Sequence, residues 1–248
     1  KVCDFLEKSI ALGTTRAIGQ QNTTTEGEKN PKQIKTPGSV EINKSTKLIP
    51  ANFKNGFQYI EKDLEQVLFL SSFKTSGYLD ESRFIASVLN THLGGGMSSK
   101  LFQEIREKRG LAYSVGTSFT TYRDIGLFDI YLGTDLKKLS ESKKVLAELK
   151  NEISQKGLTQ KELDDAKRML RGAIMIVEDE AEERMTSLAL SEIRFKRNIT
   201  LEEALEKIEN VELDQVNDFC KNIFIEDNSY QALMGKVSHK ELQGAFWG

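Results

Sequence analysis

Two apolar segments joined by a short turn constrain the fold of this 248-residue chain more than any other feature. Residues 126–133 alternate between apolar and polar positions and predict a strand, and residues 112–122 predict the strand before it, with a turn at Arg123 and Asp124. Strands joined by so short a turn pair antiparallel. Further strands are predicted over residues 64–73 and 229–237, and no regular alternation of strands and helices occurs. We therefore expect an α+β domain with a largely antiparallel sheet flanked by helices.

Helices are predicted on both sides of this hairpin. Asp80 can cap a helix over residues 81–92, and Ser98 or Ser99 can cap a second helix that stops at Gly110. After the hairpin, a long helix is expected over residues 136–155, ending at Gly157.

Two capping boxes begin the later helices. Thr159 with Glu162 starts a helix at Gln160, which we expect to run, straight or kinked, through an acidic segment to about residue 196. Thr200 with Glu203 starts the short helices that extend to residue 224.

The N-terminal part differs in composition from the rest. Residues 1–12 have the apolar spacing of an amphipathic helix, whereas residues 13–50 are rich in Thr, Gly, Asn and Lys. Such a polar segment cannot bury enough surface to fold alone. We interpret residues 1–12 as the end of a preceding helix or domain, residues 13–50 as a linker, and residues 51–248 as the folded domain.

The composition of the chain limits the classes of partner it can bind and indicates the cellular compartment. The net charge is −2, with no basic excess that would indicate nucleic acid binding. No apolar run approaches the roughly 18 residues that span a bilayer, so no membrane partner is expected. Cys3 and Cys220 lie far apart without a C-x-x-C motif, which favours free thiols and a cytoplasmic location, although a single long-range bridge stays open.

The common catalytic constellations are missing. His92 and His239 are the only histidines, and neither has a second histidine four residues away, so an H-x-x-E-H zinc motif is excluded and no metal site is expected in this chain. There is no G-x-S-x-G motif, and the triple glycine after His92 does not continue as a phosphate-binding loop. The acidic residues 178–183 indicate a solvated helix face, and His92 a helix-end residue, in preference to metal ligands.

One segment resembles a known family. LGGGMSSKLFQEIREKRGLAYSV, residues 93–115, resembles the signature of the second, non-zinc half of pitrilysin/insulinase-type zinc metallopeptidases. It is most similar to the small bacterial members related to mitochondrial processing peptidase. The strand DIGLFDIYLGT, the helix beginning GLTQKELDDAKRML and the closing helices beginning TLEEALEKIENVE also resemble that family, so that the similarity covers about residues 51–236.

This resemblance implies a fold and a role. Family members are built from related α+β halves that close like a clamshell around a chamber. One half carries H-x-x-E-H and zinc, and the other carries an arginine and a tyrosine, seven residues apart, that contact the substrate and transition state across the chamber. These positions correspond to Arg106 and Tyr113. The resemblance thus implies no cofactor in this chain, and zinc in a partner half.

The residues themselves allow two interpretations of this pair. Arg106 is predicted in the last turn of a helix and Tyr113 just inside the following strand, with Gly110 at the corner between them. A guanidinium and a phenol on such rigid supports could hold a peptide carbonyl and the negative charge that develops on it. Alternatively, Arg106 pairs with Glu107 or Glu104, and Tyr113 packs on the sheet.

The glycines leave a similar choice. In the processing-peptidase relatives, the region corresponding to Gly94, Gly95 and Gly96 is a substrate-binding loop, whereas a short triple glycine also suits a plain turn between packed helices.

Two functions follow as expectations. In the first, the chain is the substrate-side half or subunit of a zinc metalloendopeptidase, completes the active site of a zinc-bearing half, and is not proteolytic by itself. Its partners would be that half, in the same polypeptide or a separate subunit, and a peptide substrate, with a homodimer as a further option. In the second, it is a non-catalytic structural protein of the same fold, like the core subunits of respiratory complexes.

Overall fold

The computed structural model describes residues 51–238, in which five strands form one sheet in the order β1-β5-β2-β4-β3. Every neighbouring pair is antiparallel except β1 and β5, which are parallel. The expected α+β fold with a largely antiparallel sheet is confirmed. The strands are β1 (Gly56–Glu61), β2 (Val67–Thr75), β3 (Ser114–Thr121), β4 (Gly126–Thr134) and β5 (Ser229–Gly235).

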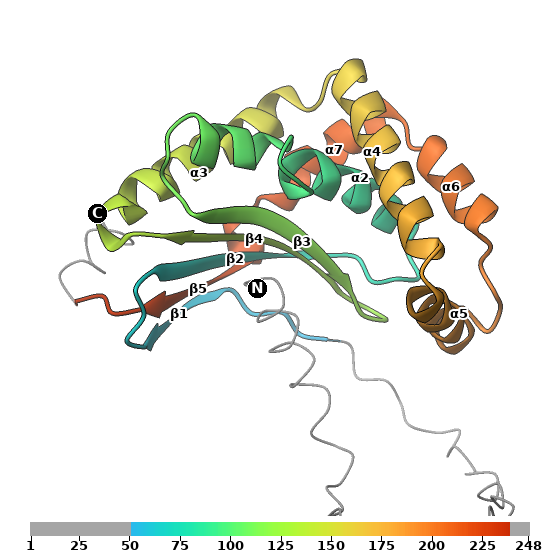
Figure 1. Ribbon diagram of the computed structural model, residues 1–248, viewed down its shortest axis with the longest axis horizontal. Helices are drawn as coiled ribbons and strands as arrows, with labels where there is room; N and C mark the ends of the chain where they lie inside the picture. The colour runs from blue at the N-terminus through green and yellow to red at the C-terminus, as the bar shows by residue number, and fades with distance from the viewer. Residues whose placement is uncertain (1–50, 239–248) are drawn as a thin grey trace, which may run out of the picture. The chain divides into compact units, whose positions relative to one another are not determined.

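Helices gather over one face of this sheet (Figure 1). The core lies between the two layers, where side chains such as Phe73, Phe128 and Leu89 are fully buried. The ring of Phe224 packs edge-on against Phe73 with ring centroids 5.2 Å apart, which joins the end of the helical layer to the sheet. The helices are α2 (Ser82–Gly94), α3 (Leu139–Lys156), α4 (Gln160–Glu178), α5 (Ala181–Phe195), α6 (Leu201–Glu209) and α7 (Leu213–Ile223), with short turns η1 (Phe102–Glu107), η2 (Leu136–Lys138) and η3 (Glu226–Asn228).

The two predicted capping boxes start helices, with one change, whereas the predicted cap at Ser98 or Ser99 is wrong: the Ser98 hydroxyl contacts Met169 and the Ser99 hydroxyl has no partner within residues 51–238. Asp80 accepts the N–H of Ser82, but the residue in the cap position of α2 is Glu81. The Glu162 backbone N–H donates to Thr159 Oγ1 over 3.3 Å, and the Glu162 carboxylate accepts from the Thr159 N–H, which completes the box that starts α4. Thr200 likewise accepts the N–H of Glu203 over 3.2 Å. The carboxylate of Glu203, however, is bound by the guanidinium of Arg197, so its reciprocal bond to the cap is replaced by an ion pair.

Two other expectations need correction, and one strand is additional. The single helix expected from residue 160 to 196 is two helices, because Glu180 adopts an extended backbone conformation between α4 and α5. The second predicted helix is mainly the π-helical turn η1. Strand β1 was not predicted, since only Phe57 and Tyr59 on it are half-buried and its apolar signal is weak.

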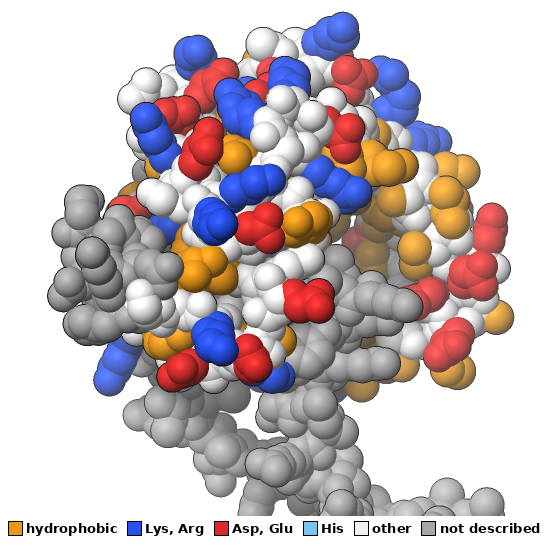
Figure 2. Space-filling view, turned by 60° about the vertical axis from the view of Figure 1, so that its left-hand side comes forward, with side chains coloured by type: hydrophobic (Ala, Val, Ile, Leu, Met, Phe, Trp, Pro, Cys, Tyr) orange, Lys and Arg blue, Asp and Glu red, His pale blue; other side chains and the backbone are white. Residues whose placement is uncertain are grey.

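The surface of residues 51–238 is mixed in charge. On the face drawn in Figure 2, basic and acidic side chains are interspersed, and hydrophobic side chains gather towards its right-hand margin. No helix in the described range is long and apolar enough to cross a membrane. The predictions for residues 1–12, the linker 13–50, Cys3 and His239 fall outside the described residues.

Candidate functional site

A tight corner connects η1 to the edge strand β3, and we call residues 102–114 the η1–β3 corner. The turn widens to the π-helical pattern, with the Lys108 N–H donating to the carbonyl of Gln103 over 2.9 Å. Gly110 then adopts a left-handed conformation, with φ of 59°, and its N–H donates to the Arg106 carbonyl over 3.0 Å. Glycine suits this position because a Cβ disfavours positive φ.

The η1–β3 corner is braced from the segment that follows β4. The carbonyl oxygen of Leu111 accepts hydrogen bonds from the hydroxyls of Thr134 and Ser142. Lys138 Nζ donates to the Gly110 carbonyl over 2.9 Å. Ile105, next to Arg106, is fully buried in the core. The backbone that carries the predicted site residues is therefore held on both sides, as a preorganised site requires.

Arg106 projects from the last turn of η1 and is 47% exposed. Its guanidinium carbon lies 4.7 Å from the centroid of the Phe102 ring. Its Nε is 3.9 Å from the Glu107 carboxylate, at the outer limit of an ion pair. Glu104, the other acidic neighbour, is bound instead by Lys108 and Arg109, at 2.5 and 2.6 Å. A long, exposed ion pair of this kind holds the guanidinium weakly.

Tyr113 lies one residue before β3, not inside it as the sequence predicts, although its N–H already donates to the Gly133 carbonyl over 2.9 Å. The side chain is 55% exposed and does not pack on the sheet. Its hydroxyl donates to Asp135 Oδ2 over 3.2 Å. The negative charge of Asp135, aided by this hydrogen bond, raises the pKa of Tyr113, so the phenol keeps its proton at neutral pH.

The triple glycine is packed at its start and open at its end. A Cβ on Gly94, the last residue of α2, would lie 2.1 Å from the backbone nitrogen of Thr117 on β3. A Cβ on Gly95 would lie 2.7 Å from Thr91 Cα, whereas one on Gly96 would meet no atom within 4 Å. Close packing accounts for the first two glycines, and Gly96 is free to face another molecule.

A groove of about 530 Å³ runs beside this turn between α2, η1 and α4. His92 lines it, and burial lowers the pKa of its imidazole, opposed by the charge of Glu162, so that the ring is neutral at pH 7. The hydroxyl of Ser99, also in the groove wall, is buried without a hydrogen-bond partner in residues 51–238. No group of three or more His, Cys, Asp or Glu side chains in that range is placed to hold a metal, so the described residues do not fit a zinc site.

Sequence reasoning did not find Asp135 or the groove. Asp135 follows β4 as one acidic residue among many, and only the pairing of β3 with β4 brings it to Tyr113. The groove depends on the packing of α4 beside α2, which no local pattern shows.

Comparison with known proteins places this geometry in a family. The family model described as the peptidase M16 inactive domain matches residues 23–170, which include the whole η1–β3 corner and the triple glycine. This chain belongs to the peptidase M16 inactive-domain family.

Relatives support the assignment and show its extent. The M16 inactive domain is 34% identical over 164 residues to an uncharacterized zinc protease of Mycobacterium bovis, covering 66% of this chain and 37% of that protein. It is 33% identical over 167 residues to the uncharacterized zinc protease YmxG of Bacillus subtilis, covering 67% and 41%. The chain thus spans less than half the length of the curated relatives it matches.

Solved structures agree on the fold. A peptidase M16 inactive domain from Pseudomonas fluorescens superposes with a TM-score of 0.63 and 28% identity, over 75% of this chain and 44% of that one. A chain of complex III2 from Candida albicans gives a TM-score of 0.69 at 16% identity, over 79% and 50%, which shows likeness of fold alone.

Proposed function

We propose that this M16 inactive domain is the substrate-side half of a zinc metalloendopeptidase. It completes the active site of a partner half that carries H-x-x-E-H and zinc, and it is not proteolytic by itself. The observation that carries the proposal is the placement of Arg106 and Tyr113. Both side chains are exposed at the η1–β3 corner, whose backbone is braced from several sides.

The chemistry of the pair suits peptide hydrolysis. Arg106 offers a permanent positive charge with several N–H donors, and Tyr113 offers a phenol that stays protonated beside Asp135. Arg106 can donate to the carbonyl oxygen of a substrate peptide as negative charge builds on it, and Tyr113 can do so when its single O–H turns from Asp135 to the substrate. Loss of one such donor typically costs about 2.7–4 kcal/mol of transition-state stabilisation, or roughly 10²–10³-fold in rate.

The partner half is proposed to lie in the same polypeptide or in a separate subunit. Gly96 is proposed to contact the backbone of the substrate peptide. The zinc-protease names of the relatives, and the fact that each is more than twice as long as its aligned part, support a partner half. The free, buried thiol of Cys220 is consistent with a cytoplasmic location.

Reconstitution with a zinc-bearing half tests the proposal. We expect the mixture to cleave a fluorogenic peptide, and Arg106→Ala and Tyr113→Phe each to lower kcat/KM by about 10²-fold with unchanged thermal unfolding. Arg109→Ala is the matched control, because Arg109 lies in the same corner but is engaged by Glu104. Its activity should stay near wild type.

Wild-type cleavage rates in both Arg106→Ala and Tyr113→Phe would reject the proposal. A mixture that cleaves no faster than the zinc-bearing half alone would instead favour a non-catalytic structural protein, the alternative with which the fold likeness to the complex III2 chain is compatible.

A further inference from the structure

Helix α5 exposes an apolar stripe that the described part of the chain leaves uncovered. No residue of α5 is buried, and Met185, Leu188 and Ile193 are 64%, 44% and 66% exposed. With Ala189 they occupy positions i, i+3, i+4 and i+8, which lie on one face of the helix, and we call these four residues the α5 stripe. A helix normally turns such a face towards the core, so an exposed one indicates a binding surface.

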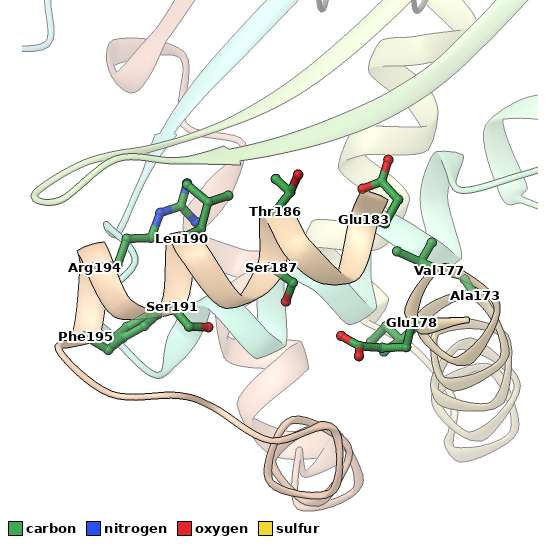
Figure 3. A pocket seen from close by; sticks show the side chains of 11 residues that line it. Ala173, Val177, Glu178, Glu183, Thr186, Ser187, Leu190, Ser191, Arg194 and Phe195 are labelled. Atoms are coloured by element: carbon green, nitrogen blue, oxygen red, sulfur yellow. The ribbon is translucent and has the colours of Figure 1, made fainter. Parts of the chain in front are cut away.

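The α5 stripe points away from the domain. The opposite side of the helix faces α4 across a groove of about 450 Å³ (Figure 3). Ser187, Ser191 and Arg194 contribute to this groove from α5, and Val177 from α4. These α5 positions lie about half a turn from the stripe, so the stripe faces outward. Leu190 and Phe195 also line the groove, and the side of α5 that faces its own domain is therefore mixed in polarity.

Contacts at both ends fix α5 in place. Near its start, Arg184 Nη1 lies 3.3 Å from Glu178 Oε2 of α4. At its end, the Phe195 ring packs against Tyr78 with centroids 5.5 Å apart, and the guanidinium carbon of Arg83 lies 5.2 Å from the centre of the same ring. The stripe is thus presented in a preformed conformation, which lowers the entropic cost of binding.

The two ends of α5 carry opposite charges, so that one copy of the helix can complement a second copy. Acidic residues precede and open the helix, and Lys196 follows it: the acidic residues are Asp179, Glu180 and Glu182, whereas Glu183 and Arg194 line the groove on the side that faces α4. A helix of 15 residues is about 22 Å long, which exceeds the Debye length of about 8 Å at physiological salt, so the two ends act separately. Parallel pairing of two copies would set like charges together, whereas antiparallel pairing sets each acidic end against a basic end.

We infer that α5 binds α5 of a second copy of this chain, antiparallel, about a two-fold axis near Leu188 and Ala189. The patch is self-complementary, as a two-fold interface requires, and the small side chain of Ala189 lets the helices approach closely. In this alignment Glu192 falls near Arg184 of the second copy, and Glu182 near its Lys196. The inference does not depend on the peptidase role proposed above.

Sedimentation velocity over a concentration series tests the interface. The 248-residue chain should show a monomer–dimer equilibrium that weakens with added salt, and Leu188→Glu should raise the dimer dissociation constant by about tenfold or more. Ile225→Glu is the control, because Ile225 is an exposed apolar residue outside α4 and α5. Circular dichroism should show both variants folded, since neither site is in the core.

Disulfide trapping tests the orientation in a Cys3→Ser background. Ala189→Cys near the axis should cross-link two copies under mild oxidation, whereas Ile193→Cys should not, because antiparallel pairing separates the two copies of residue 193. Equal cross-linking of both variants would indicate parallel pairing and overturn the inference. Glu182→Lys and Lys196→Glu should each weaken the dimer, and their combination should restore it.

Three further results would overturn the inference. One is a wild-type chain that stays monomeric at every concentration, and another is a dimer unaffected by Leu188→Glu. The third is a zinc-bearing half that binds a monomeric chain and loses that binding in Leu188→Glu, because the stripe would then be the contact between the two halves.

Discussion

At the scale of single residues, the missing side chain of Gly94 allows helix α2 to lie close to strand β3. The C-terminal end of α2 lies directly against β3, where the Thr117 hydroxyl also donates to the Asn90 carbonyl over 3.0 Å. A Cβ on Gly94 would meet backbone atoms of Thr117 and Gly116, which cannot move without shifting β3. Gly96, two residues later, has open space where its Cβ would be.

Gly94→Ala should therefore destabilise the domain by about 3 kcal/mol or more, because overpacking against backbone is not relieved by a rotamer change. Gly96→Ala, the matched control, should stay within about 0.5 kcal/mol of wild type. Urea unfolding followed by circular dichroism measures both. Equal stability of the two variants would contradict the described packing of α2 on β3.

At the scale of elements, the η1–β3 corner and the residue that follows β4 act together. Asp135 precedes η2 in an extended conformation, and its carboxylate accepts the Tyr113 hydroxyl. This contact orients the phenol and raises the Tyr113 pKa above its usual value of about 10. Since Tyr113 is exposed, the contact concerns the position and protonation of one side chain more than stability.

Asp135→Asn should lower the pKa of Tyr113 towards that of a free tyrosine, because the main cause of the shift is the negative charge of Asp135. Tyrosine Cζ chemical shifts followed by NMR through the alkaline range measure this, with the Tyr113 signal assigned by its loss in Tyr113→Phe. An unchanged titration in Asp135→Asn would show that the charge of Asp135 does not act on Tyr113.

Local patterns predicted the elements whose cause is local. The alternation of residues 126–133 predicted β4, and the pairing of Thr159 with Glu162 predicted the start of α4 to the residue. Strand β1 was missed because its pairing partner, β5, lies at the other end of the described chain. The break at Glu180 was missed because an acidic run is compatible with both a helix and a turn. In addition, no residue of α5 is buried, so the sequence has no core-facing pattern that would show α5 as a separate helix.

The same distinction applies to the candidate site. Arg106, Gly110 and Tyr113 lie within one continuous segment, so their spacing could be recognised. Asp135 reaches Tyr113 only because β3 pairs with β4, and Glu162 lies near His92 only because α4 packs beside α2. Local sequence patterns do not specify either contact.

At the scale of the whole molecule, helices pack against one face of the sheet, and the opposite face carries the buried carboxylic acid side chain of Asp129. Phe128 and Ile130 of β4 point into the helical core, so Asp129 between them lies on the opposite face. Asp129 is only 4% exposed. It is flanked in register by Ser72 on β2 and Ser118 on β3, whose hydroxyls both donate to its carboxylate.

Burial raises the pKa of Asp129, and the two serine hydrogen bonds only partly offset this. The folded domain thus binds a proton at Asp129 more tightly than the unfolded chain does. Its contribution to stability is fully present below the unfolded-state pKa of about 3.9, and is lost as the pH rises through the higher folded-state pKa.

Asp129→Asn removes this ionisation and keeps the shape of the side chain. We expect the variant to be more stable than wild type at pH 7, on the order of 1 kcal/mol, with the difference shrinking towards pH 4. Thermal unfolding across that pH range measures the difference, and Asp227→Asn, at an exposed residue of η3, controls for the loss of one negative charge. If Asp129→Asn changed stability equally at pH 4 and pH 7, the charge of Asp129 would not destabilise the sheet, and its place between Ser72 and Ser118 would matter only for packing.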